Sequence, residues 1–251
     1  MILDEIIRRT QKRVERLPTS FPDDILYPHV SLADAIRNKN GKNAVIAEIK
    51  CISPSHGILR RNVDMAMMAG VLVRAGCIAL SILTEPYFFG GTAQDIKQVK
   101  KAVSIPVLRK DFIIDERQIA ESRALGADAV LLIAAILKDR LSDFVDRSGD
   151  YGLEPLVEVH NQADVELALA TDATLIGINN RNLATLTIDR STTRNLSGSI
   201  WLAGRIIVSE SGMRSADDIR EMKPYCDAFL IGSSIMSHEY PQRKLEEFVF
   251  A

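Results

Sequence analysis

Glu48 and Lys50 close a short apolar run, AVIAEIK (44–50), and the turn SPSHG (53–57) follows it. Side chains alternate between the two faces of a β-strand, so Glu48 and Lys50 share one face with Ile46. Burying unpaired charge is costly, and two opposite charges on an apolar strand therefore require a partner, a ligand or a chemical role. Taken alone, the two residues could equally form a structural ion pair.

Lysine, glutamate and asparagine recur at the ends of four further apolar runs. Together with the first pair they form the set Glu48, Lys50, Lys110, Glu158, Asn179 and Glu210. Apposed lysines and carboxylates shift one another's pKa values, which suits them to general acid–base catalysis near neutral pH. Any single member could be a structural ion pair, but the whole set at comparable positions favours a catalytic site.

The elements that would position this set alternate regularly from residue 44 onward. The expected strands are 44–50, 78–83, 105–110, 128–133, 154–159, 174–179, 205–210 and 227–231, and the expected helices are 63–75, 93–102, 115–125, 138–149, 161–170, 190–196, 215–222 and 240–249. Eight strand–helix units predict an α/β fold of the (β/α)8 TIM-barrel type, whose active site lies at the carboxyl ends of the strands. A doubly wound sheet is the alternative, disfavoured because no G-x-G-x-x-G follows the first strand.

Local signals fix the ends of these elements and the extent of the domain. Helix caps are predicted at Asp64, Thr92, Asp115, Asn161 and Ser215. The first seventeen residues have apolar side chains at roughly helical spacing, and their acidic residues argue against a transit peptide. We therefore expect a single barrel domain over 1–251, with 1–43 as an N-terminal helical extension packed on its surface. No internal repeat is visible at the level of residues.

Composition limits the classes of partner. The chain has 251 residues, of which 47% are hydrophobic and 25% charged, and its net charge is −2. This balance argues against nucleic acid or an anionic membrane, since both require a basic surface. Three well-separated cysteines and four scattered histidines predict a reduced, cytoplasmic setting without a disulfide framework or a metal site.

Two serine–glycine turns point to a phosphate. Ser211-Gly212 follows the seventh strand, and Gly232-Ser233 follows the eighth. TIM barrels commonly bind phosphate there, through backbone N–H groups and a short helix after the last strand. Each turn alone is ordinary, but both at the expected places favour a phosphate site that an acidic chain can still provide.

The segments that carry these residues resemble one family, the indole-3-glycerol phosphate synthases of tryptophan biosynthesis. The similar segments are AEIKCISPSHG (47–57), SILTEPYFFGG (81–91), IPVLRKDFIID (105–115), GADAVLLI (126–133), EPLVEVH (154–160), GINNRNL (177–183), SESGM (209–213) and FLIGSSIM (229–236). The resemblance spans the barrel in family order and spacing. It implies a cytoplasmic carbon–carbon lyase without metal or cofactor that converts 1-(2-carboxyphenylamino)-1-deoxyribulose 5-phosphate to indole-3-glycerol phosphate with loss of carbon dioxide and water.

The resemblance also implies roles for individual residues. Lys110 would be the general acid that protonates the substrate carbonyl, and Glu158 the base or the partner in dehydration. Lys50 would bind the substrate carboxylate and is a candidate source of the later proton. The remaining implied contacts are orientation of the lysines by Glu48 and Glu210, binding of Glu158 and anionic groups by Asn179 and Arg181, substrate binding by Ser211, an anthranilate pocket of Phe89 and Phe112, and phosphate binding by Ser53, Gly212, Gly232 and Ser233.

Two alternatives remain at this point. Another phosphosugar barrel enzyme is the first, but an isomerase of that kind would need a cysteine base and an aspartate acid at the strand ends. A non-catalytic barrel is the second, and it predicts loss of Lys50, Lys110 or Glu158, all of which are present. The only partner expected is a small phosphorylated molecule, for a protein that is a monomer, with a weak homodimer as the alternative. The SPSHG loop and the loop 86–92 are candidates to close over that molecule.

Overall fold

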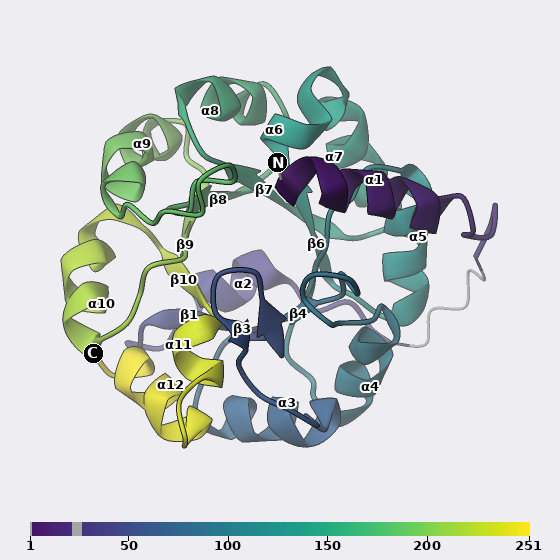
Figure 1. Cartoon of the computed structure of the whole chain (residues 1–251). Coiled ribbons are helices and arrows are strands. Elements are labelled where there is room, and N and C mark those ends of the chain that lie inside the picture. The colour runs from purple at the N-terminus through teal and green to yellow at the C-terminus, as the bar shows by residue number, and fades with distance from the viewer. Residues whose placement is uncertain (1, 22–26) are drawn as a thin grey trace.

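Eight parallel strands form a closed barrel in the computed structural model, which describes residues 2–21 and 27–251 (Figure 1). Around the barrel the strands follow the order β1-β10-β9-β8-β7-β6-β5-β4. They are β1 (Ala44–Ile49), β4 (Ala79–Leu83), β5 (Val107–Lys110), β6 (Ala129–Ile133), β7 (Glu154–Val159), β8 (Leu175–Asn179), β9 (Ile206–Glu210) and β10 (Ala228–Ile231). The predicted (β/α)8 TIM barrel is therefore confirmed, with each strand within two residues of its expected start.

Helices surround the barrel in the order expected from the sequence. They are α3 (Met65–Arg74), α4 (Gln94–Ala102), α5 (Glu116–Leu125), α7 (Leu141–Asp150), α8 (Gln162–Leu169), α9 (Ser191–Leu202), α10 (Ala216–Met222) and α12 (Pro241–Val249). Helix α9 runs six residues beyond its predicted end, because Leu196 and Ile200 are buried at helical spacing and outweigh the poor helix propensity of Gly198 between them. The predicted cap at Thr92 is wrong: Ala93 is the N-cap of α4, and no side chain caps it.

Several short elements were not predicted. A hairpin of β2 (Ile52–Ser53) and β3 (Gly57–Ile58) follows β1, and α6 (Ala134–Leu137) follows β6. Single 3-10 turns, η1 (Lys138–Arg140) and η2 (Lys223–Tyr225), join α6 to α7 and α10 to β10. Helix α11 (Ser233–Met236) is the short helix expected after the last strand. Elements of two to four residues carry too little periodicity to be found from one sequence.

Strand alternation divides the core into two layers. Residues such as Val45, Val130 and Val157 face the surrounding helices, whereas Ile46, Leu108, Leu131, Leu156, Val208 and Leu230 fill the barrel interior. The residue two positions after each inner one faces the interior again, nearer the carboxyl end. That period places the predicted polar set directly above the apolar filling.

The amino-terminal end of the barrel is closed by α2 (Leu32–Arg37), whose Leu32 and Ile36 join the inner core. The Glu154 carboxylate, at the start of β7, accepts hydrogen bonds from the backbone N–H of Leu32 (2.5 Å) and Ala33 (3.1 Å) and from the Ser31 hydroxyl (2.6 Å). These bonds satisfy N–H groups that the first turn of a helix leaves unpaired. Part of the segment 1–43 therefore closes the amino-terminal end of the barrel.

Helix α1 (Ile2–Val14) confirms the predicted N-terminal helix and lies across the opposite end, the mouth of the barrel (Figure 1). Arg13 forms an ion pair of 2.7 Å with the buried Asp111, and the Arg9 guanidinium lies 5.0 Å from the centre of the Tyr87 ring. The helix thus packs over the loops that follow β4 and β5. These strand-end contacts place the expected surface helix over the mouth of the barrel.

Two strand–helix–strand units on opposite sides of the barrel share local details. Asp128, just before β6, accepts a hydrogen bond of 2.8 Å from the N–H of Val107, and Asp227, just before β10, accepts one of 2.8 Å from Ile207. Helices α5 and α10 both begin with a capping box. This equivalence, which the residues alone did not show, places the last residues of β5 and β9 at matching positions across the barrel. No described helix is long and apolar enough to span a bilayer.

Candidate active site

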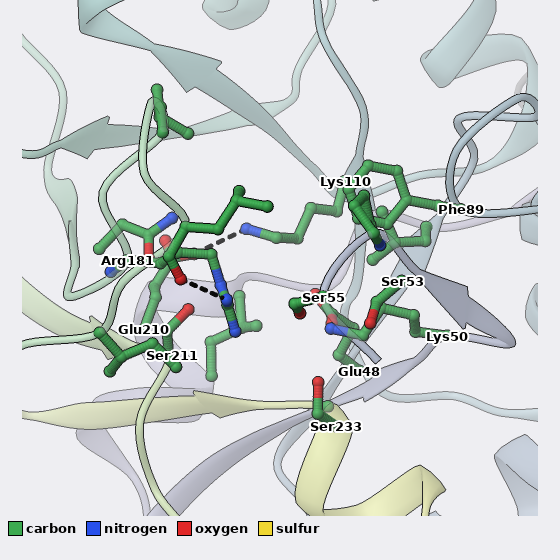
Figure 2. Close-up of a pocket in the computed structure, with 18 of the residues that line it drawn as sticks. Glu48, Lys50, Ser53, Ser55, Phe89, Lys110, Arg181, Glu210, Ser211 and Ser233 are labelled. Carbon is green, nitrogen blue, oxygen red and sulfur yellow. Dashed lines mark hydrogen bonds and ion pairs between the residues drawn. The ribbon is translucent and has the colours of Figure 1, made fainter. Parts of the chain in front are cut away.

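A cavity of about 190 Å³ opens at the carboxyl ends of the strands (Figure 2), and Ile2, Leu3 and Ile6 of α1 line part of it. Every site residue predicted from the sequence lines it: Glu48, Lys50, Ser53, Phe89, Lys110, Phe112, Glu158, Asn179, Arg181, Glu210, Ser211, Gly212, Gly232 and Ser233. Side chains that the sequence analysis did not select also line it, among them Ile2, Leu3, Ser55, His56 and Arg214. The sequence analysis did not select the α1 residues as site residues, because their spacing predicts a helix but not which surface that helix covers.

Lys110 lies at the centre of the charged side chains that line the cavity. Its ammonium Nζ is 2.7 Å from Glu210 Oε2 and 3.2 Å from Glu158 Oε2. Burial alone would lower the pKa of Lys110, but the carboxylates of Glu210, Glu158 and Glu48 outweigh it and raise this pKa above its ordinary value. Lys110 is therefore an ammonium at neutral pH and has a proton to donate.

The two carboxylates that share Lys110 differ in their remaining surroundings. Burial raises the pKa of Glu158, but the charges of Lys110 and His160 and a hydrogen bond from Asn179 bring it below its ordinary value. Burial raises the pKa of Glu210 to about 7, since the pull of Lys110 is opposed by the Glu158 charge. The Oε1 atom of Glu210 is buried and accepts no hydrogen bond from the described residues. Glu158 is thus ionised at neutral pH, whereas Glu210 gains or loses a proton near neutral pH.

Lys50 and Glu48 form the ion pair that the sequence left open, with Nζ 2.5 Å from Oε1. The Glu48 side chain is 3% exposed and that of Lys50 is 13% exposed. Because both line the cavity, the pair is a structural contact and part of the candidate site at once.

Two glycines make room for the carboxylates. A Cβ atom at Gly177 would lie 2.2 Å from Glu210 Oε1, and one at Gly232 would lie 2.3 Å from Glu48 Oε1. Real Cβ atoms do not approach an oxygen so closely, so any side chain at either position would displace a carboxylate. The sequence analysis gave Gly177 no role.

One side of the cavity is made of serine and glycine turns. Ser211 and Gly212 follow β9 with φ of 66° and 95°, and left-handed residues in succession turn backbone N–H groups toward one side. The Ser234 hydroxyl in α11 donates a 2.5 Å hydrogen bond to the carbonyl of Met213, which ties the two turns together. Ser53 lies in the β2–β3 hairpin, where its hydroxyl accepts a hydrogen bond from the His56 N–H.

The other side is aromatic and apolar. The ring centres of Phe89 and Phe112 are 6.3 Å apart, and the rings are tilted by 36°. The loop that carries Phe89 is folded around Glu85, whose carboxylate accepts hydrogen bonds from the N–H groups of Tyr87, Phe88 and Phe89. Figure 2 shows Phe89 and Ser211 at opposite sides of the cavity, with the charged residues between them.

Comparisons with known proteins identify relatives over the whole chain. A sequence model of the family described as indole-3-glycerol phosphate synthase matches residues 3–248. The enzymes of that name from Thermoanaerobacter pseudethanolicus and Caldanaerobacter subterraneus are each 42% identical over 99% of this chain and 97% and 98% of their own lengths. The one from Bordetella pertussis is 44% identical over 86% of this chain and 84% of its own.

Solved structures agree with the barrel at low sequence identity. Tryptophan synthase from M. tuberculosis superposes with a TM-score of 0.63 at 13% identity, over 88% of this chain and 98% of that one. Thiamine phosphate pyrophosphorylase from Pyrococcus furiosus gives 0.62 at 15% identity, over 85% and 95%. Similarity at this level of identity supports the fold alone.

Proposed function

The chain belongs to the indole-3-glycerol phosphate synthase family of decarboxylating lyases in tryptophan biosynthesis, and on that premise we propose how its own residues perform the family's reaction. The substrate, 1-(2-carboxyphenylamino)-1-deoxyribulose 5-phosphate, has a phosphate at one end and an aromatic ring at the other. The observation that carries the proposal is the matching polarity of the cavity. Ser211 and its turn lie on one side and Phe89 on the other, and Lys110 extends between them.

Binding would follow that polarity. The phosphate contacts N–H groups and hydroxyls of Ser53, Gly212, Gly232 and Ser233, and Ser211 lies beside it. The anthranilate ring lies against Phe89 and Phe112, beneath Leu3 of α1. Stretching the substrate between these two ends places its reacting carbonyl over Lys110, so binding energy is used for orientation.

Ring closure requires a proton at the carbonyl oxygen while the aromatic carbon attacks. Lys110 is the acid, and two of its three protons already face Glu158 and Glu210, which leaves one for the substrate. Its raised pKa is compatible with this task, because the alkoxide that develops at the carbonyl oxygen is a stronger base than a lysine amine. Lys50, paired with Glu48, binds the carboxylate that leaves as carbon dioxide.

Dehydration requires a base for the ring proton and an acid for the departing hydroxyl. Glu158 is the base, because it is ionised and lies within reach of Lys110. Either Lys50 or Lys110 is the acid that protonates the departing hydroxyl. Arg181 and Asn179 hold Glu158 and the anionic groups of the substrate. Side-chain acid–base chemistry accounts for each step. We further propose that the chain works as a single-domain cytoplasmic monomer on this substrate.

The test is product formation from the purified protein. The carboxyphenylamino substrate, in buffer with EDTA, is incubated with the wild type and with Lys110→Met, and the indole fluorescence is followed. Lys101→Met, an exposed lysine on α4, is the matched control. We expect product from the wild type and the control, and substrate binding without turnover in Lys110→Met. Absence of product with the wild type refutes the proposed function, and turnover by Lys110→Met refutes the role of Lys110.

A further inference from the structure

His160 is a buried titratable residue to which the mechanism above assigns no role. It follows β7 directly, two positions after Glu158, and its side chain is 12% exposed. It lies behind Glu158, outside the set of described side chains that line the cavity. It therefore touches the reaction only through Glu158.

Both ring nitrogens of His160 face a carboxylate. Nε2 lies 3.2 Å from Glu158 Oε1 and Nδ1 lies 3.6 Å from Asp164 Oδ2, both at ion-pair distance, although neither contact has hydrogen-bond geometry. Asp164 is fixed in turn, because its carboxylate accepts a 2.9 Å hydrogen bond from the His160 N–H and its own N–H donates to Asn161. A neutral imidazole has one N–H and cannot present a proton to both carboxylates, whereas an imidazolium can.

These contacts give the two carboxylates at Lys110 unequal numbers of cationic partners. Glu158 faces Lys110 through Oε2 and His160 through Oε1. Among the described residues, Lys110 is the one cation that forms an ion pair with Glu210. The charged groups in contact are thus Asp164 on α8, His160 directly after β7, Glu158 on β7, Lys110 on β5 and Glu210 on β9. Negative charge is best accommodated on the carboxylate with two cations beside it.

We propose that His160 is a positioning residue: held as an imidazolium between Asp164 and Glu158, it keeps Glu158 ionised toward Lys110 and leaves Glu210 as the carboxylate that takes up a proton. The proposal rests on the proposed function, in which Glu158 is the base. It agrees with the electrostatics, since burial lowers the pKa of His160 but Asp164 and Glu158 outweigh this and raise it to about 9.

The charge of the ring can be tested without any turnover. The proton signals of the four histidine rings are followed by NMR as a function of pH, and His160→Gln identifies the signal that belongs to His160. We expect that ring to be an imidazolium at pH 7 and to titrate near pH 9. A neutral ring at pH 7 would overturn the proposal. Because this readout is independent of substrate, an inactive wild type would refute the proposed function without deciding the charge of His160.

Kinetics test the consequence for Glu158. In His160→Gln the acidic limb of the kcat profile should move up by about one to three pH units, the effect of one opposite charge near a carboxylate. KM should stay within about twofold, because His160 does not contact substrate, and His238→Gln, an exposed histidine, should leave the profile unchanged. A uniform loss of kcat at all pH values would indicate a merely structural role and overturn the proposal.

Asp164→Asn provides a second variant if His160→Gln does not fold. It keeps an oxygen that accepts from the His160 N–H but removes one of the two charges that hold the imidazolium. The His160 ring should then titrate at lower pH than in the wild type, and the acidic limb should move in the same direction as in His160→Gln by less. An unchanged ring titration would contradict the arrangement.

Discussion

Glu210→Gln should make the protein more stable at pH 8. The pKa of Glu210 rises from 4.5 to about 7 on folding. Between these values the folded state holds a proton that the unfolded state has lost, so the free energy of unfolding falls as pH rises. At about 1.4 kcal/mol per pH unit the loss reaches about 3 kcal/mol above pH 7.

Glutamine imitates the protonated form and escapes this loss. Its amide oxygen can still accept a hydrogen bond from Lys110 Nζ, so the variant should match the wild type at pH 5 and exceed it at pH 8. For a chain of this length about 3 kcal/mol corresponds to roughly 6–12 °C in Tm. Urea unfolding at both pH values should be followed by far-UV circular dichroism, because Trp201 is 43% exposed and reports poorly on the core.

Glu154→Gln is the matched control, the same chemical change at a carboxylate with only structural partners. Loss of the Glu154 charge should weaken the hydrogen bonds that α2 donates to this side chain. The free energy of unfolding should therefore fall by about 1 kcal/mol at both pH values. If Glu210→Gln proved no more stable than the wild type at pH 8, or equally stabilised at pH 5, the reasoning about the charge on Glu210 would be refuted.

Three further substitutions, the first with a control variant, test other parts of the structure. Gly177→Ala should displace the Glu210 carboxylate and lower kcat by about 10- to 100-fold, whereas Gly198→Ala, in open space on α9, should stabilise by about 0.5 kcal/mol; equal kinetics in the two variants would contradict the steric argument. Lys100→Met should lower the free energy of unfolding in urea by about 3 kcal/mol, because it leaves the buried Asp128 charge without its 2.8 Å partner; a loss under 1 kcal/mol would count against that pair. Arg13→Met should raise KM about tenfold through loss of the contact that holds α1 over the mouth, and unchanged steady-state kinetics would show that α1 needs no such contact.

The fold and the membership of the cavity could be predicted because both depend on short-range periodicity. A period of two fixes which face Glu48, Lys110 and Glu210 occupy, and barrel closure brings the strand ends together wherever the register falls. Their chemistry did not follow from the sequence in the same way. That Glu158 and Glu210 titrate so differently depends on neighbours from four elements.

The contributions that escaped prediction share a physical reason. Gly177 matters because a carboxylate from the next strand occupies the space of its missing side chain, and α2 matters because Glu154, far along the chain, caps it. His160 carried no metal-like spacing, and its charge state depends on Asp164 four residues on. Distances between elements decide these effects, whereas periodicity within an element reveals only faces.

Five charged side chains at and behind the cavity alternate in sign, and their order explains which carboxylate takes up a proton. Glu210, Lys110, Glu158, His160 and Asp164 form a row of alternating charge, with successive separations of 2.7, 3.2, 3.2 and 3.6 Å. If all five groups are charged, three carboxylates and two cations leave one negative charge in excess. Protonation of one carboxylate removes that excess. Asp164 accepts a hydrogen bond from the backbone N–H of His160, and Glu158 lies between two cations. Glu210 has one cation and a buried oxygen without a partner among the described residues. The proton is therefore best accommodated on Glu210, beside the lysine that we propose as the acid of the reaction.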